Sequence, residues 1–420
     1  MSLLAASAWP AEDAGPARLA APLRMRGPMV SEATKLVSVT REVLVATMVV
    51  EGASGATYLL RHGGPPDAVA VVEQFDPVTL ETLATSPDLA GGPVWPGGVG
   101  VLDSGDLLIV FGNHVHRLTS ELELVTSRRL PRDRPYNSFV ALAGGLIATK
   151  DFAGPFQGAD PNDSRPSELL VLDPTTLEIV SSLELSEPSV ARLSASGDEI
   201  VVVGVDSLLS VDLVDGVLHE REQRVRYRTR PGQGYGWDAV LDGDLAFFLD
   251  DGEGSEAFDG SFEGRGMATE PLRLHRINRV TGEATSVEVC GLPGGLIANP
   301  PALDQSRRIV VGFDSGNSIV TAFDADELRE LWSVHLGHGS HPIVLPDAGE
   351  VVLSDFDRGR GTEDVVVLDI ETGEERGRAS TASPVQSVVF PAVGSTGAVY
   401  WVSFFSLSRI DAVARDSDAS

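Results

Sequence analysis

A short phrase recurs seven times along this chain of 420 residues: a hydrophobic strand, Asp or another polar residue, a tight turn, and Glu opening a second strand. The clearest copies are residues 75–81, 172–178 and 368–374, and the looser ones are 212–216, 278–283, 324–330 and 118–123. Asp followed by Pro-Thr or Glu-Thr-Gly caps its own backbone in a turn. Each phrase therefore predicts a hairpin of two outer strands, repeated at a period typical of rings and solenoids.

Pairs of apolar, alternating segments lie between these hairpins, each pair broken by a Gly or Asp turn. The pairs are 99–102 with 107–110, 139–142 with 146–149, 190–193 with 200–203, 239–241 with 245–249, 302–303 with 309–312, 343–345 with 351–353, and 388–390 with 399–402. Residues 36–40 with 43–50 look like an eighth inner pair. The pattern predicts an all-β, single-domain β-propeller of eight four-stranded blades, with seven blades as the alternative.

The two ends of the chain are expected to close the ring. The C-terminal segment supplies only three strands up to residue 413, and its fourth strand is expected from about residues 18–30. Pairing of N- and C-terminal strands removes an exposed sheet edge. We therefore divide the chain into an N-terminal arm (1–30), the propeller (31–413) and a disordered tail (414–420).

Charge and composition narrow the range of partners. The net charge is −29, from 61 acidic and 32 basic residues, which argues against nucleic acid because phosphate contacts need Lys and Arg. Apolar runs stay below the roughly 18 residues of a membrane span, so no membrane partner is expected. Cys290 is the single cysteine, and residues 1–29 make a poor secretory signal. A soluble, acidic, cytoplasmic protein is the expectation.

Two copies of the repeat carry a resemblance to a known superfamily. Residues 322–324 with Trp332 follow the A-x-D…W docking pattern, and residues 368–373 keep its Asp-x-x-Thr-Gly part. The chain thus resembles the quinoprotein-like propellers, including the PQQ-repeat and YVTN-type families, in architecture. Quinoprotein dehydrogenases of that superfamily use an adjacent cysteine pair at the cofactor. One cysteine cannot supply it, so the resemblance does not imply PQQ here.

A candidate site follows from propeller geometry. First strands start, and second strands end, around one mouth of the central channel, which gathers polar residues from separate blades. The residues so selected as substrate contacts are Trp95, Asn137, Ser138, Trp237, Asp238, Asn299 and Gln386, and those selected for catalysis are Lys150, Asp151, His341 and Asp355. Polar residues also end ordinary strands, which is the structural alternative.

Roles can be assigned to the catalytic group. His341 is expected to act as a general base or as a metal ligand, oriented by Asp355. Lys150 is one of two lysines among 30 arginines, which suggests a role that needs an ammonium. A three-His metal site at His335, His338 and His341 is less expected than His341 alone. The cofactor is therefore left as unknown, with a divalent cation at His341 and Asp355 as one hypothesis.

Two long insertions, 153–167 and 252–267, lie on the same face and contain acidic residues. They would form lids, hold Ca²⁺ or remain plain surface loops. The function predicted is a small-molecule site at the channel mouth, with metal-assisted hydrolase, lyase or isomerase chemistry favoured over redox chemistry. The alternative is a non-catalytic propeller that binds a ligand or a protein partner.

Overall fold

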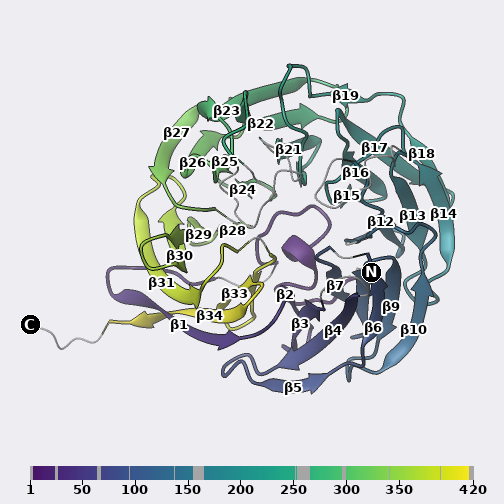
Figure 1. Ribbon diagram of the computed structural model, residues 1–420, viewed down its shortest axis with the longest axis horizontal. Helices are drawn as coiled ribbons and strands as arrows, with labels where there is room; N and C mark the ends of the chain where they lie inside the picture. Colours follow the sequence, from purple (N-terminus) through teal and green to yellow (C-terminus); the bar gives the residue numbers. More distant parts are fainter. Residues whose placement is uncertain are drawn as a thin grey trace, which may run out of the picture.

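Eight four-stranded antiparallel sheets are arranged as blades around a central channel (Figure 1). The computed structural model describes residues 3–23, 27–63, 68–93, 95–136, 138–154, 165–250, 252, 265–295, 299–339, 341–387 and 389–415. The prediction of an eight-bladed all-β propeller is confirmed. In the described ranges the only helix is the three-residue 3₁₀ turn η1 (Glu12–Ala14), and no helix there is long and apolar enough to cross a membrane.

The blades follow one another in sequence, and the strands of each are listed here from the innermost to the outermost. The first blade is β2 (Ala46–Glu51), β3 (Thr57–His62), β4 (Ala68–Phe75) and β5 (Thr82–Thr85), with β6 (Leu89–Gly92) also paired with β4, and the second is β7 (Gly98–Val101), β8 (Leu107–Phe111), β9 (His114–Leu118) and β10 (Leu124–Arg129). The third blade is β11 (Val140–Ala141), β12 (Ile147–Lys150), β13 (Glu168–Leu172) and β14 (Ile179–Glu184). The fourth is β15 (Ser194–Ser196), β16 (Glu199–Val203), β17 (Ser207–Val214) and β18 (Val217–Glu220), with β19 (Val225–Arg226) also paired with β17. The next three are β20 (Val240–Asp242), β21 (Leu245–Leu249), β22 (Pro271–Asn278) and β23 (Ala284–Pro293); β24 (Ala302–Asp304), β25 (Ile309–Asp314), β26 (Ile319–Asp324) and β27 (Glu330–His335); and β28 (Ile343–Leu345), β29 (Glu350–Asp357), β30 (Thr362–Asp369) and β31 (Glu375–Ser383). The last blade is β32 (Ala392–Val393), β33 (Val399–Ser403), β34 (Ser406–Ala414) and β1 (Thr34–Glu42).

The repeated phrase forms the outer hairpins, as predicted. In the β13–β14 turn, Asp173 Oδ1 accepts hydrogen bonds from the amides of Thr175 and Thr176 at 2.7 and 2.9 Å. The fifth residue, Leu177, closes the turn by donating its amide to Asp173 O at 2.8 Å with φ of 60°. Asp76, Asn278, Asp324 and Asp369 cap their turns in the same way.

The docking tryptophan joins two neighbouring blades. Trp332 on β27 donates from Nε1 to Ile370 O at 2.9 Å. Its ring leaves room only for glycine at position 373, where a Cβ would lie 2.7 Å from the indole and where φ is 74°. The resemblance to quinoprotein-like propellers therefore has a direct structural counterpart at this blade junction.

The ring is closed by a strand that differs from the predicted one. β1 pairs with β34 over nine residues on each side, from Thr34↔Ala414 to Glu42↔Ser406. Residues 36–40 are therefore the outer strand of the last blade, and the first blade begins with β2. Residues 18–23 and 27–30 contain no strand. The prediction that residues 18–30 supply the closing strand was wrong, because the alternation in residues 36–40 fits an outer strand as well as an inner one.

Two first strands begin a few residues later in the structure than the sequence predicted. Residues 190–193 precede β15, and residues 389–390 precede β32. For the former, the backbone is used elsewhere: Arg192 N donates to the Asp238 carboxylate, and Leu193 O accepts from Arg18. These polar groups are satisfied by side chains rather than by a sheet ladder.

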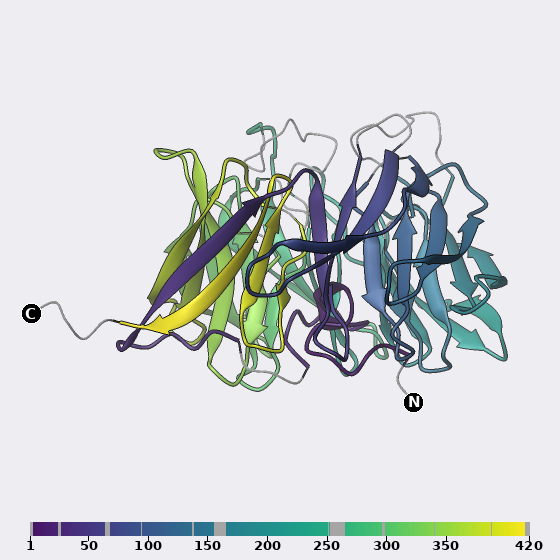
Figure 2. The ribbon, with the colours of Figure 1, turned by 90° about the horizontal axis from the view of Figure 1, so that it is seen from below.

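The described part of the N-terminal arm, residues 3–23, fills the central channel (Figures 1 and 2). We call this segment the plug. Its carbonyl oxygens accept hydrogen bonds from first strands of five blades: Trp9 from Glu51, Pro10 from Val101, Pro16 from Ala195, Ala17 from Leu241 and Ala20 from Val344. First strands turn one edge towards the channel, so the plug satisfies amides that a bare channel would leave to water.

Candidate functional site

A chain of alternating charges crosses the channel, and we call it the charge chain. Its members, in order of contact, are Asp13, Arg18, Glu12, Arg192 and Asp238. Arg18 Nη1 lies 3.2 Å from Asp13 Oδ2 and 2.6 Å from Glu12 Oε1, and Arg192 Nε lies 3.1 Å from the same Glu12 oxygen. The plug thus supplies three of the five charges, and the start of two blades supplies the others.

Every member of the charge chain is buried. Burial raises the pKa of Glu12 despite its two arginine neighbours. Burial would also raise the pKa of Asp13, but contacts with His341 and Arg18 outweigh it and hold that pKa below its ordinary value. Buried charges are tolerated only when paired and hydrogen-bonded. The network therefore fixes the plug firmly in the channel.

Two of the predicted mouth residues, Ser138 and His341, contact the plug. Ser138 Oγ donates to Glu12 Oε2 at 2.8 Å and accepts from Arg18 Nη2 at 2.6 Å. His341 Nδ1 lies 3.7 Å from Asp13 Oδ1, and its ring centroid lies 4.2 Å from that of Phe390. The rule that collected first-strand starts around the channel therefore brought these two residues to one place.

Asp238 forms the other end of the charge chain. Its Oδ1 accepts from Arg192 N at 2.6 Å. Its Oδ2 is fully buried, lies 4.0 Å from Arg192 Nη1, and receives no hydrogen bond from the described residues. The indole Nε1 of the adjacent Trp237 is likewise buried without an acceptor in that part of the chain. Unsatisfied buried polar atoms are rare in native proteins and call for an explanation such as water, an ion or a ligand.

Lys150 lies at the end of β12 and is also buried. Its Nζ donates to Ser189 O at 3.0 Å and approaches Asp151 O at 3.4 Å. Burial lowers the pKa of this amine to about 7, although the carboxylates of Asp151 and Asp238 oppose that shift. An amine that titrates near neutrality can act as a general base or nucleophile as well as a cation.

An aromatic cluster adjoins Lys150 and Asp238. It consists of Trp95, Phe152, Tyr235 and Trp237, packed with Val190 and Val205. Lys150 Nζ lies 4.9 Å from the centre of the Phe152 ring, and that ring lies 5.6 Å from the ring of Trp95. The predicted contacts Trp95, Trp237 and Asp238 thus come together with Lys150 in one region of the channel.

Two predicted catalytic carboxylates are engaged elsewhere. Asp151 Oδ2 lies 3.0 and 3.3 Å from Arg134 and Arg132, and its Oδ1 accepts from Glu168 N at 2.5 Å. Asp355 accepts from Gly337 N at 2.6 Å and pairs with Arg378 at 3.0 Å. His341 faces Asp13 instead of Asp355, so the predicted orienting pair is not formed.

The residues proposed as metal ligands do not form a coordination site in the described ranges. No group of three or more His, Cys, Asp or Glu side chains converges there as metal ligands would. His338 hydrogen-bonds Ser315 Oγ at 2.8 Å and Ser387 O at 2.7 Å, and burial lowers its pKa to about 4. His335 ends the outer strand β27. The three histidines thus have different surroundings, and we derive no step through a metal.

The remaining predicted contacts divide into two groups. Asn299 and Gln386 are buried residues that precede β24 and β32. Asn137 lies outside the described residues, as do 155–164, 251 and 253–264, which include most of the two acidic insertions.

Sequence reasoning missed four members of the site: Glu12, Asp13, Arg18 and Arg192. A signal was present for the first three, because they are the only charged residues among the first 23. Charges of both signs in an otherwise apolar Ala- and Pro-rich segment suit a buried ion network. Arg192 stands between Ala191 and Leu193 in an apolar strand pattern, which is a similar signal.

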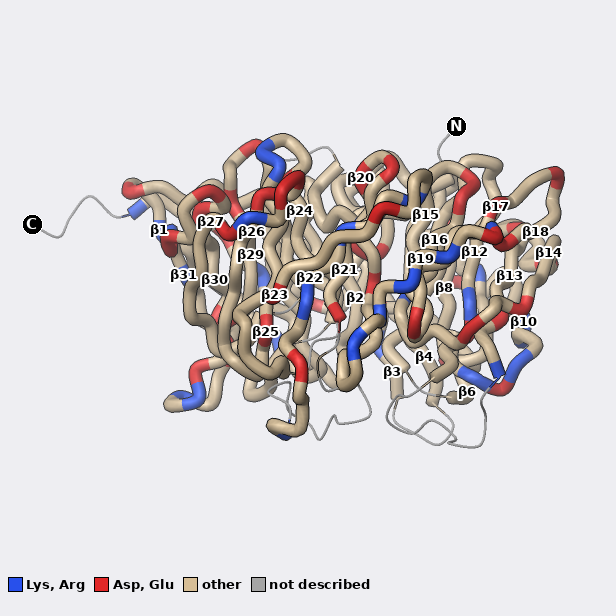
Figure 3. The backbone as a smooth tube through the Cα atoms, turned by 90° about the horizontal axis from the view of Figure 1, so that it is seen from above, with Lys and Arg blue, Asp and Glu red and all other residues tan. Residues whose placement is uncertain are grey.

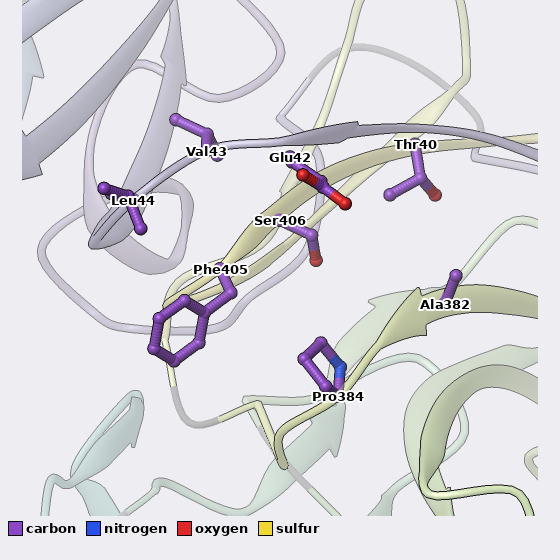
Figure 4. A pocket seen from close by; sticks show the side chains of 8 residues that line it. All are labelled: Thr40, Glu42, Val43, Leu44, Ala382, Pro384, Phe405 and Ser406. Atoms are coloured by element: carbon purple, nitrogen blue, oxygen red, sulfur yellow. The ribbon is translucent and has the colours of Figure 1, made fainter.

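A separate groove lies on the outside of the ring, between the last two blades (Figure 4). Its volume is about 590 Å³, and it is lined by Thr40, Glu42, Val43, Leu44, Ala382, Pro384, Phe405 and Ser406. Leu44 and Phe405 are exposed. Over the rest of the described backbone, basic residues are interspersed with acidic ones (Figure 3).

Comparison with known proteins identifies the fold of this chain but no family to which it belongs. Neither family models nor curated proteins match the chain. Among solved structures, the quinohemoprotein alcohol dehydrogenase ADHIIG from Pseudomonas putida HK5 is similar with a TM-score of 0.62 at 10% identity, over 99% of this chain and 82% of that one. The designed protein Ika8 gives 0.58 at 13% identity (90% and 100%), and BamB from Moraxella catarrhalis gives 0.52 at 13% (91% and 99%). At these identities the likeness concerns the β-propeller fold alone.

Proposed function

We propose that this propeller binds a small polar molecule at the mouth of its channel, in the region of Lys150, Asp238 and the aromatic cluster. The buried Asp238 Oδ2, which lacks a hydrogen-bond donor in the described residues, is the observation that carries this proposal. A ligand donor at that oxygen would relieve the cost of a buried unsatisfied carboxylate.

The chemistry that these side chains support is acid–base catalysis. Lys150 titrates near neutral pH, so it can accept and return a proton under physiological conditions. The aromatic cluster supplies apolar surface that excludes water and orients a ligand. Hydrolase, lyase or isomerase reactions fit this set of groups, with Lys150 as the acid–base residue and Asp238 as the orienting carboxylate.

A thermal-shift screen of small polar compounds tests this proposal. Compounds that raise the Tm of the wild type should lose that effect in Asp238→Asn, and the size of their effect should change in Lys150→Met. Matched controls are Asp244→Asn, an exposed turn residue of the same blade, and Lys35→Met, the other lysine, which is also exposed. Stabilising compounds that act equally on all four variants would refute a site at Lys150 and Asp238.

A protein-binding scaffold is the second candidate, favoured by the groove with exposed Leu44 and Phe405. An apolar side chain of a partner would fit this groove. In that case a Leu44→Ser/Phe405→Ser variant would lose partner binding, whereas Asp238→Asn would retain it. The two candidates are thus separated by which variant disturbs function.

A further inference from the structure

On the basis of the proposed site, we infer that its ligand has a primary ammonium group and a small apolar body. Asp238 binds the ammonium group, and the apolar body packs against the aromatic cluster. This names the class of the ligand rather than a compound. Charge, hydrogen bonding and the neighbouring side chains each contribute to the inference.

The first argument is charge balance along the charge chain. Three carboxylates share two guanidinium groups, and the ion-pair contacts of 3.2 Å or less all go to Glu12 and Asp13. Arg18 is fully used by Glu12, Asp13, Ser138 and the carbonyl of Leu193. At the far end, Asp13 also faces His341. Among the described residues, Asp238 therefore has the longest cationic contact of the charge chain, at 4.0 Å from Arg192 Nη1. A buried carboxylate in this state favours a cation.

The second argument is hydrogen bonding. Asp238 Oδ2 is an acceptor, and an ionised carboxylate can only accept. A ligand carboxylate would place two acceptors together, whereas an ammonium supplies three donors and the missing charge. Charge-assisted hydrogen bonds of this kind are stronger than neutral ones. A primary ammonium fits better than a quaternary one, because the latter has no N–H to donate.

The third argument concerns Lys150, a buried lysine whose charged form Asp238 favours. Its Nζ is hydrogen-bonded to the carbonyl of Ser189, and no ion pair with Asp238 is formed. The groups acting on its protonation are Asp151 and Asp238, which favour the charged form, and Arg192 and Arg18, which oppose it. Because its pKa is about 7, the Lys150 charge is present in only part of the molecules at neutral pH. A ligand ammonium would supply the charge and expel the Lys150 proton.

The fourth argument is the surface beside the carboxylate. Trp237 is adjacent to Asp238 in sequence and belongs to the aromatic cluster. Aromatic faces attract cations and also pack against apolar groups. Phe152 already shows this contact with Lys150 Nζ. An ammonium on an apolar body would use both properties.

Calorimetric titration with head-group series tests the inference. The probes are benzylamine, benzyl alcohol and benzoate, together with butylamine, butan-1-ol and butyrate, so that each apolar body carries all three head groups. At least one amine should bind the wild type at pH 8 about tenfold or more tighter than its alcohol. Asp238→Asn should remove that advantage, whereas Asp244→Asn should retain it.

A pH profile gives the discriminating signature. Amine affinity should rise from pH 6 to pH 8 in the wild type, as Lys150 loses its charge, and should stay level in Lys150→Met. Preferred binding of a carboxylate, lost in Lys150→Met, would overturn the inference while leaving the proposed site standing. Equal binding of amine and alcohol, or binding of no amine, would also overturn it. Failure of the proposed site itself would be seen in the thermal-shift screen described above rather than in this titration.

Discussion

Burial shifts the pKa values of Lys150 and Glu363 towards neutrality, and both shifts can be tested through the pH dependence of stability. Lys150 has its pKa lowered to about 7 by burial, from an ordinary value of 10.5. The folded state then binds fewer protons than the unfolded state between these values, so this residue makes the protein more stable as pH rises from 7 to 10.5. Below pH 7 the folded protein carries a buried ammonium at full cost.

Lys150→Met should therefore raise the Tm, and by more at pH 6 than at pH 9.5. The methionine keeps the length of the side chain and removes the buried charge. Thermal unfolding across this pH range, with Lys35→Met as the exposed control, measures the effect. A gain in Tm that is equal at both pH values would mean that Lys150 does not titrate near neutrality.

Glu363 changes the stability of the protein with pH in the opposite direction. It is fully buried on β30, its carboxyl accepts a hydrogen bond from Ser387 N at 2.7 Å, and burial raises its pKa to about 8. The folded state holds its proton longer than the unfolded state, so stability is lost as pH rises from about 4.5 towards 8. Glu363→Gln keeps the acceptor and cannot ionise. Its Tm relative to the wild type should increase between pH 5 and pH 9, and a constant difference in scanning calorimetry would contradict this pKa.

At the scale of the single element, the outer hairpin turn makes an unusual demand on one residue. The fifth position has a positive φ and is occupied by leucine in some copies, such as Leu80 and Leu177, and by glycine in others, such as Gly282 and Gly373. A left-handed conformation costs an ordinary residue about 1–2 kcal/mol, which burial of the leucine side chain offsets. Leu177 is completely buried.

The expected order of stability at this position is Leu177, then Leu177→Gly, then Leu177→Ala. Both variants lose the buried side chain, at a cost of roughly 2–5 kcal/mol for alanine. Glycine avoids the left-handed strain and should retain about 1 kcal/mol more than alanine. Urea unfolding measures the free energies. The usual order, with glycine below alanine, would show that backbone strain does not matter in this turn.

These hairpins were predictable because their signal is local. Asp173 caps amides two and three residues ahead, so seven residues of sequence contain the whole interaction. The closing strand was not predictable in the same way. Residues 36–40 alternate like any half-buried strand, and their partner β34 lies more than 360 residues away. Alternation states which face is buried but not which strand pairs with it.

In the candidate site, too, some residues were predictable from the sequence and others depended on long-range contacts. Ser138, Trp237, Asp238 and His341 were found because one topological rule places strand starts around the channel. Asp151 and Asp355 were selected by the companion rule for the ends of second strands, but arginines bind their side chains. The plug escaped prediction because the strands that bond its carbonyl oxygens are distributed over five blades, and no local pattern encodes that. Arg18 reaches Leu193, and that contact exists only once the ring has closed.

At the scale of the whole molecule, the N-terminal segment has two separable tasks. Residues 3–23 fill the channel without contributing a strand, whereas β1 closes the ring. Removal of residues 1–23 should leave eight blades, since each keeps its four strands. The channel side chains Arg192, Asp238 and His341 would then gain water in place of the plug, and the Tm should fall through loss of buried surface such as Trp9.

Removal of residues 1–42 should cause self-association rather than only a lower Tm. It also deletes β1, so the nine paired residues of β34 would present an open sheet edge, and exposed edges associate with other chains. Light scattering coupled to gel filtration should show the shorter truncation at the mass of the full-length protein and the longer one self-associated, while circular dichroism reports strand content in both. Because both variants lack the plug, the difference between them isolates ring closure. A shorter truncation that fails to fold would instead make the charge chain part of the folding core, and the channel network would then be needed for the blades to assemble at all.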